Sequence, residues 1–260
     1  MKLYIMTDME GLSGVRCVEQ TQSGSPKYEE GRRFLVSDVN AAIEGALEAG
    51  VKEIVVNDGH GGGPHFPLDD LHPAARYERP KGGRSPMPTL DDSFHAFFMV
   101  GAHAMAGTLN GFLDHTQSSV SWFNYSMNGR LAGELGQMGA IAGHFGVPTV
   151  LVTGDHAACE EAKSFFPGLE TVAVKVGIGR SDAQCLHPKR TAELIREAAK
   201  RAIVRAGEIE PYRLSVPVEV VLQFARSDYA DSLAQRSEVE RLDARTIRKV
   251  MATAKDVIAF

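Results

Sequence analysis

Cysteine is scarce in this sequence, and long apolar runs are missing. The three cysteines, Cys17, Cys159 and Cys185, are far apart and form no CxxC pair, so they predict no disulfide framework. We expect all three to be small buried side chains of a protein in the reducing cytoplasm. No apolar run approaches the roughly 20 residues that span a bilayer, and acidic residues interrupt the N-terminus where a signal peptide would be apolar. The sequence therefore predicts a cytoplasmic protein with no membrane partner.

Basic runs are missing as well. The formal net charge is -5, and charges of both signs are scattered along the chain, so nothing indicates a nucleic-acid partner. Of the 260 residues, 43% are hydrophobic and 23% are charged, which is ordinary for a globular protein. A chain of this length buries most of its apolar surface without needing disulfides.

Short apolar runs alternate with segments of helical spacing along the chain. This alternation predicts an α/β fold with a largely parallel sheet flanked by helices, followed by a smaller C-terminal α+β portion. We expect a metal-site domain over residues 1–165, a smaller portion over 166–260, and a surface loop rich in Pro, Gly and Arg over 77–88. The expected strands are 3–6, 53–56, 97–100, 149–152, 171–174 and 218–224, and the expected helices are 28–49, 133–144, 188–206 and 244–259.

Residues suited to metal binding follow three of the expected strands. Asp8 and Glu10 end the first and, being two apart, face the same side. His60 follows the second strand in a glycine-rich loop, and His103 follows the third. A lone Asp-x-Glu is usually solvated, and one such histidine is more often structural. Parallel sheets, however, gather ligands at the carboxyl ends of their strands, so the three positions together predict a shared site.

Two further residues complete the candidate site. Glu134 opens an expected helix, where it is either a ligand or a carboxylate that stabilises the helix dipole by about 0.3–1 kcal/mol. His115 lies in a loop, so we interpret it as a catalytic group beside the metal. It would orient the attacking species or protonate the leaving amine, and a nucleophilic role stays open.

Charge and ligand type favour a pair of divalent cations. Asp8, Glu10 and Glu134 supply three negative charges, and imidazole with carboxylate ligands suits zinc, with manganese or cobalt as weaker options. Paired ions in hydrolases lie roughly 3.5–4 Å apart. Asp8, closest to its strand end, is the natural shared ligand.

The chain resembles the zinc-dependent D-aminopeptidases of bacterial dipeptide-transport operons. The matching stretches are MKLYIMTDMEG, VVNDGH, VGAHA, the region of Asp114 and His115, GRLAGELG, VPTVLVTGD and CLHP. The resemblance implies hydrolysis of short peptides or amides with an N-terminal D-amino acid. It also implies a homodecamer of two stacked rings of five. Finally, it implies two Zn²⁺ per subunit bound by a bridging Asp8 with Glu10, His60, His103 and Glu134, and His115 as the catalytic histidine.

One position departs from the family pattern. Met6 stands where the family has a serine two residues before the bridging aspartate. A polar contact beside the ligands is therefore lost, or Thr7 supplies it. The departure leaves all the expected ligands in place.

Motifs of other enzyme classes are incomplete or missing in the sequence. The HGGG run at residues 60–63 resembles an esterase oxyanion loop, but the sequence has no GxSxG elbow. No GxGxxG follows the first strand, which leaves dinucleotide binding without support. Two alternatives stay open: hydrolysis of another amide or ester at the same metal site, and a non-catalytic metal- or peptide-binding protein. His115 discriminates a hydrolase from the non-catalytic protein, because binding alone does not need this residue.

Overall fold

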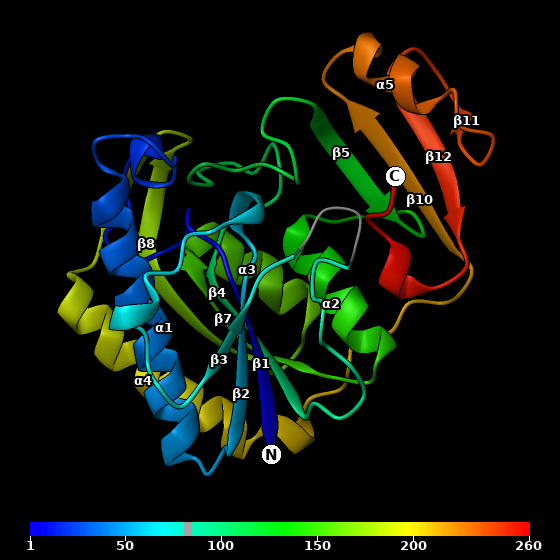
Figure 1. Ribbon diagram of the computed structural model, residues 1–260. Helices are drawn as coiled ribbons and strands as arrows, with labels where there is room; N and C mark the ends of the chain where they lie inside the picture. Colours follow the sequence, from blue (N-terminus) through cyan, green and yellow to red (C-terminus); the bar gives the residue numbers. More distant parts are fainter. Residues whose placement is uncertain (81–84) are drawn as a thin grey trace.

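The chain is built on a seven-stranded sheet, here called sheet A, with the order β3-β2-β1-β4-β7-β8-β9. The computed structural model describes residues 1–80 and 85–260. Every neighbouring pair from β3 to β8 is parallel, and β9 pairs antiparallel with β8. The strands are β1 (Lys2–Thr7), β2 (Glu53–Asp58), β3 (Arg76–Glu78), β4 (Ala96–Ala102), β7 (Thr149–Asp155), β8 (Glu170–Gly179) and β9 (Asp182–Cys185) (Figure 1).

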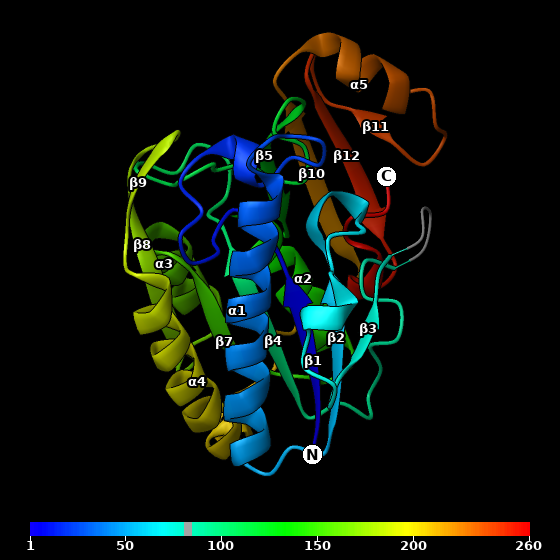
Figure 2. The same cartoon turned by 60° about the vertical axis from the view of Figure 1, so that its left-hand side comes forward.

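Helices cover both faces of sheet A. One face carries α1 (Tyr28–Glu48) and α4 (Pro188–Val204), which pack against each other, and the other carries α2 (Glu134–His144) and α3 (His156–Phe165) (Figure 2). Parallel neighbours need crossover connections, and α1, α2 and α3 lie on those from β1 to β2, β4 to β7 and β7 to β8. The expected α/β fold with a largely parallel, helix-flanked sheet is confirmed.

A second, antiparallel sheet, here called sheet B, has the order β11-β12-β10-β5-β6. It forms the expected smaller α+β part together with α5 (Ser227–Leu233). Each sheet takes strands from both sides of residue 165, where we expect a domain boundary, and that division stays a prediction. The strands of sheet B are β5 (Trp122–Met127), β6 (Arg130–Leu131), β10 (Val218–Phe224), β11 (Glu240–Arg241) and β12 (Thr246–Met251).

Some sequence-based expectations were wrong. The expected helix at 244–259 is instead β12 followed by the short 3₁₀ helix η5 (Ala254–Asp256), because the β-branched Thr246, Ile247 and Val250 pair well along β10. The expected loop at 77–88 begins within β3, and its residues 81–84 lie outside the described residues. Cys159 is buried as expected, whereas Cys17 and Cys185 are half-buried, and all three are free. The helices expected at 28–49, 133–144 and 188–206 are confirmed to within two residues.

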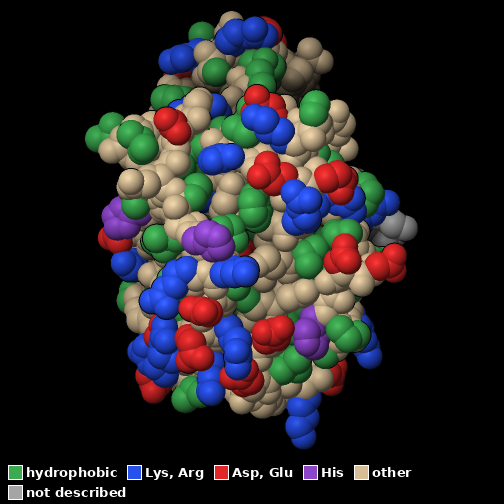
Figure 3. Space-filling view, turned by 90° about the vertical axis from the view of Figure 1, so that its left-hand side faces the viewer, with side chains coloured by type: hydrophobic (Ala, Val, Ile, Leu, Met, Phe, Trp, Pro, Cys, Tyr) green, Lys and Arg blue, Asp and Glu red, His purple; other side chains and the backbone are tan. Residues whose placement is uncertain are grey.

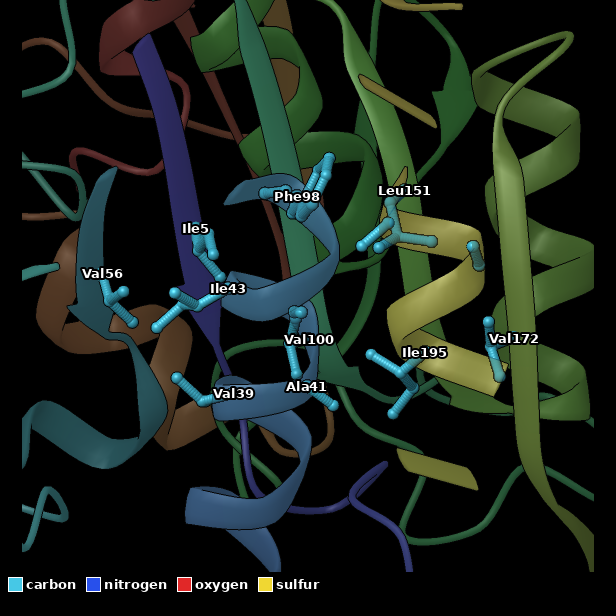
Figure 4. Packing of buried hydrophobic residues seen from close by; sticks show 14 of the residues in the cluster. Ile5, Val39, Ala41, Ile43, Val56, Phe98, Val100, Leu151, Val172 and Ile195 are labelled. Carbon is cyan, nitrogen blue, oxygen red and sulfur yellow. The ribbon is translucent and has the colours of Figure 1, made fainter. Parts of the chain in front are cut away.

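The helices α1 and α4 have a charged outer face and an apolar inner face. Acidic and basic side chains are interspersed on the surface over these helices, without a field of one sign (Figure 3). Their inner side chains pack on sheet A, where Ile43 of α1 and Ile195 of α4 meet Ile5, Val100 and other strand residues (Figure 4).

Alternate residues of the central strands point to opposite faces of sheet A. Ile5 of β1 packs under α1 and α4, while its neighbour Tyr4 packs on the other side, and Phe98 and Phe97 of β4 divide in the same way. Both faces are therefore buried, as in other parallel sheets. The rigid centre of the sheet fixes the positions at which β1, β2 and β4 end. No helix in the described part of the chain is both long and apolar enough to cross a membrane.

Candidate metal centre

Asp8 and Glu10 lie on the loop that follows β1, which packs against the end of β4. The backbone N–H of Asp8 donates to the carbonyl of Val100 over 2.9 Å, and that of Gly11 donates to the carbonyl of Gly101 over 2.8 Å. Gly101 has a φ of +82°, and a Cβ there would lie 2.3 Å from the carbonyl oxygen of Asp8. Glycine is therefore required at 101 for the ends of β1 and β4 to come this close.

Three further elements bring His60, His103 and Glu134 to the same place. His60 begins the 3₁₀ helix η2 (His60–Gly62) just past β2, His103 directly follows β4, and Glu134 is the first residue of α2. The strands β1, β2 and β4 are parallel neighbours and end at one edge of sheet A. The five side chains expected to bind metal thus meet at this edge, and we call them the acidic cluster: Asp8, Glu10, His60, His103 and Glu134.

Within the acidic cluster, Asp8 lies between two histidines. Nδ1 of His60 is 2.9 Å from Oδ1 of Asp8, and Nε2 of His103 is 3.2 Å from its Oδ2. Glu10 Oε2 lies 3.1 Å from His60 Nδ1, and Glu134 Oε1 lies 3.4 Å from His103 Nε2. The cluster therefore has two halves, each with one histidine and one glutamate, which share Asp8.

Both histidines turn an unprotonated nitrogen toward the carboxylates when the ring is neutral. His60 Nε2 donates to the carbonyl of Thr21 over 3.1 Å, and His103 Nδ1 donates to the carbonyl of Ala104 over 3.0 Å. A carbonyl oxygen only accepts, so these ring nitrogens must carry the proton. The opposite nitrogens then present lone pairs to carboxylate lone pairs, which repel each other unless a cation lies between them. Metal-binding histidines are oriented in this way by a backbone carbonyl.

Two buried atoms of the acidic cluster also lack hydrogen-bond partners in the described part of the chain, as expected where metal cations would be bound. Among the described residues, Oε2 of Glu10 and Nε2 of His103 have no hydrogen-bond partner, although other cluster atoms are near. Leaving a buried polar atom unpaired costs about 1–3 kcal/mol. Ligand atoms of Asp8, Glu10 and His103, and separately those of His103, His115 and Glu134, all lie within 4.8 Å of one another. Three carboxylates and the imidazoles form a donor set that fits zinc.

The charges of the acidic cluster shift its pKa values strongly. Burial alone would lower the pKa of His60, but Glu10 and Asp8 outweigh burial and raise it to about 11. Asp8 and Glu134 likewise hold the pKa of His103 well above its ordinary value despite burial. Burial would raise the pKa of Asp8, but the two histidines hold it far below its usual range. The carboxylates thus require positive charge beside them, from protons on the rings or from metal cations.

His115 lies beside the acidic cluster on the loop that precedes β5. Its Nδ1 donates to the carbonyl of Leu113 over 2.8 Å, and its Nε2 is 3.7 Å from Oε1 of Glu134. Leu113 has a φ of +51°, a conformation that leucine rarely adopts. Backbone strain of this kind concentrates at functional sites. The loop therefore fixes the ring of His115 with Nε2 toward Glu134.

A pocket of about 720 Å³ opens over the acidic cluster. This volume is typical of sites that bind small molecules. His103 is only 3% exposed and lies beneath the residues that line the pocket. The charged and histidine side chains that line the pocket are Asp8, Glu10, His60, His115, Glu134 and Arg180.

Met6, at the position where the resemblance predicts serine, borders a narrow cavity of about 30 Å³ beside His103 and Glu134. The hydroxyl of Thr7 donates to the carbonyl of Asn57 over 3.2 Å. Thr7 therefore does not offer its proton to the acidic cluster. Of the two outcomes expected from the sequence, the polar contact is lost.

Sequence reasoning missed Glu161, a buried carboxylate of α3. Its Oε2 accepts from the backbone N–H of Met105 over 2.8 Å, and its Oε1 accepts from that of Gly133 over 3.3 Å. It thereby joins the segments that carry His103 and Glu134. The buried positions 158, 161, 162 and 165 of α3 have helical spacing, and a glutamate among them indicates a special role. This signal was missed because no helix was expected there.

Lys175 of β8 was missed as well. Its Nζ donates to the carbonyl of Glu10 over 2.7 Å and to that of Val15 over 2.6 Å, and the side chain is 1% exposed. It therefore holds both ends of the segment that follows Glu10. A single lysine inside the apolar run of β8 was the signal, because lysine is almost never fully buried without a partner.

The chain is similar to known proteins over nearly its whole length. The sequence model of a family described as D-aminopeptidase matches residues 1–260. The chain is 33% identical over 235 residues to the D-aminopeptidase of Bacillus subtilis (strain 168), covering 89% of the chain and 84% of that protein. Among solved structures it is similar to "Zn-dependent D-aminopeptidase DppA from Bacillus subtilis, a self-compartmentalizing protease". The TM-score is 0.95 at 30% identity, covering 99% of this chain and 94% of that one.

Proposed function

The chain belongs to the D-aminopeptidase family, and on that premise we propose that it is a zinc-dependent aminopeptidase. Its substrates are short peptides or amides whose N-terminal residue has the D configuration. The observation that carries the proposal is the position of Asp8 between His60 and His103, with both rings turned so that a lone pair faces the carboxylates. The Zn-dependence of DppA, at 30% identity, supports zinc as the metal.

We propose two Zn²⁺ per chain, with Asp8 as a ligand of both. Glu10 and His60 complete one half of the acidic cluster, and His103 and Glu134 complete the other, in line with the distances of 2.9–3.4 Å between these groups. Bound zinc supplies Lewis acidity toward the scissile carbonyl and lowers the pKa of a water molecule to about 7. The protein supplies the positions, because each histidine is fixed by a backbone carbonyl.

His115 is proposed to move the proton. Its Nδ1 keeps a proton on the carbonyl of Leu113, which leaves Nε2 free to accept a proton from the attacking water. The same Nε2 then protonates the leaving amine. Glu134, 3.7 Å away, stabilises the positive charge that His115 carries between these two steps. Attack by Nε2 itself is the alternative role.

Assembly is part of the proposal. We propose a homodecamer of two stacked rings of five, the assembly that the family resemblance implies, and the description of DppA as self-compartmentalizing supports an oligomer. The surface of this chain supports assembly. Leu109 is 87% exposed and Val176 is 48% exposed, and both line one shallow apolar pocket of about 420 Å³. Exposed apolar patches of this kind mark interaction surfaces. Light scattering should give the mass of ten chains, and a monomer would contradict this part of the proposal.

The activity is tested with matched short peptides and amides that begin with a D- or an L-amino acid. The zinc-loaded protein should release the N-terminal residue from the D-series, lose this activity with a chelator and regain it when zinc is added back. Cleavage that is unaffected by the chelator would contradict the metal mechanism. Cleavage of esters or of the L-series alone would point to a different hydrolase built on the same acidic cluster.

A further inference from the structure

We propose that Arg180 binds the C-terminal carboxylate of the peptide substrate, so that the enzyme selects short peptides with a free carboxyl end. The inference rests on the proposed aminopeptidase function and extends it to the far end of the substrate. A short peptide at neutral pH carries a positive amine and a negative carboxylate. The pocket must therefore accommodate both charges.

Acidic side chains outnumber basic ones among the residues that line the pocket. Asp8, Glu10 and Glu134 place three carboxylates in it, and these, with the metal ions proposed between them, occupy the site of bond cleavage. Among the described residues that line the pocket, Arg180 is the only lysine or arginine. A substrate carboxylate would be repelled by the acidic side chains, so Arg180 is the group that can attract it.

The backbone places Arg180 next to the proposed catalytic histidine. It lies in the turn between β8 and β9, and its carbonyl accepts from the N–H of Leu113 over 2.8 Å. The carbonyl of the same Leu113 accepts from Nδ1 of His115 over 2.8 Å. One residue thus connects Arg180 with the ring beside the reacting bond. An extended residue spans roughly 3.3–3.6 Å, so the carboxylate of a substrate of two or three residues stays near this loop.

One nitrogen of the Arg180 guanidinium group contacts an acidic side chain, and the other two are without a partner in the described part of the chain. Its Nε lies 3.4 Å from Oδ1 of Asp114, whose Oδ2 accepts from the N–H of Gly107 over 2.6 Å. The side chain of Arg180 is 51% exposed, and its two terminal nitrogens have no hydrogen-bond partner among the described residues. Asp114 therefore contacts the guanidinium at Nε, and the terminal nitrogens stay available to a ligand of the pocket that Arg180 lines. Two parallel N–H groups match the two oxygens of a carboxylate.

The test compares a peptide acid with its amide. For zinc-loaded wild type, Arg180→Gln and Arg180→Lys, kcat and KM are measured with D-alanyl-glycine and D-alanyl-glycinamide, which share the scissile bond. Wild type should prefer the acid. Arg180→Gln should raise KM for the acid by roughly 10- to 100-fold and leave KM for the amide unchanged. Arg180→Lys, which keeps the charge, should retain part of the preference.

Arg190→Gln is the matched control, because Arg190 is exposed on α4 and pairs with Glu193 outside the pocket. Its kinetics should equal those of wild type. Equal losses on acid and amide in Arg180→Gln would overturn the inference and reduce Arg180 to a support of the His115 loop. A wild type without preference for the acid would also overturn it. If wild type cleaves neither compound, the proposed function itself fails and the inference fails with it.

Discussion

His103 and His115 lie ring over ring, with centroids 3.9 Å apart and planes 13° apart. The ring of His103 is buried and belongs to the acidic cluster, while the ring of His115 lines the pocket. Stacking places Nε2 of His115 above the cluster without making it a necessary ligand. The two histidines should therefore respond differently to substitution.

His115→Ala should keep its zinc and lose turnover by roughly 10²- to 10⁴-fold, because proton transfer is removed while the ligands remain. Zinc content and kcat are measured on the same sample. His144→Ala, at the exposed end of α2, is the control and should equal wild type. Full activity in His115→Ala would remove this residue from the mechanism.

Glu161→Gln should weaken zinc binding. The amide keeps one acceptor oxygen and turns its NH₂ group toward the second backbone N–H, so the segments of His103 and Glu134 separate. A loss of zinc affinity of roughly 10- to 100-fold is expected, as for other groups that orient ligands. Competition with a chromogenic chelator measures it, with the exposed Glu160→Gln as control. Equal affinities in both variants would show that Glu161 does not position the ligands.

Lys175→Met should destabilise the fold, because the carbonyls of Glu10 and Val15 lose their donor while they remain buried. The expected loss is about 2–5 kcal/mol in the free energy of unfolding. Urea unfolding of the metal-free protein measures it. Lys163→Met, on the exposed side of α3, should stay within about 0.5 kcal/mol of wild type. A similarly small change in Lys175→Met would contradict the buried role.

Asp38 should make stability depend on pH. Burial raises its pKa to about 6, although the N–H of Ser13 donates to it, against roughly 3.9 in the unfolded chain. The folded state therefore binds this proton more tightly than the unfolded chain does. The contribution of the proton to the free energy of unfolding is fully present below about pH 4 and is lost as pH rises through about 6. The free energy of unfolding of Asp38→Asn, relative to that of wild type, should increase by about 3 kcal/mol as the pH is raised from about 4 to 7. A difference between the two proteins that does not vary with pH would contradict this.

The local pattern was sufficient to place most of sheet A and the residues expected to bind metal. Asp8, His60 and His103 each follow a short apolar run, and parallel strands bring such ends together, so their meeting at one edge could be expected. The resemblance added the roles of these residues. The spacing around Glu134 left two interpretations open, and its distance of 3.4 Å from His103 favours that of a ligand.

Contacts distant in sequence could not be predicted. Lys175 reaches Glu10 across 165 residues, and Glu161 reaches Met105 across 56, so no local period records either pair. The pairing of β12 with β10 likewise overrode a helical pattern near the C-terminus, because strand pairing depends on the partner as well as on the segment itself.

Zinc content tests most directly whether the acidic cluster binds two cations through a shared Asp8. The protein is loaded with excess zinc, desalted and analysed by mass spectrometry of the metal, beside Asp8→Ala and the exposed control Asp69→Ala. Two zinc ions per chain are expected in wild type and in Asp69→Ala, and almost none in Asp8→Ala, since both halves of the cluster depend on this carboxylate. One zinc ion or fewer in wild type, or two in Asp8→Ala, would contradict the account.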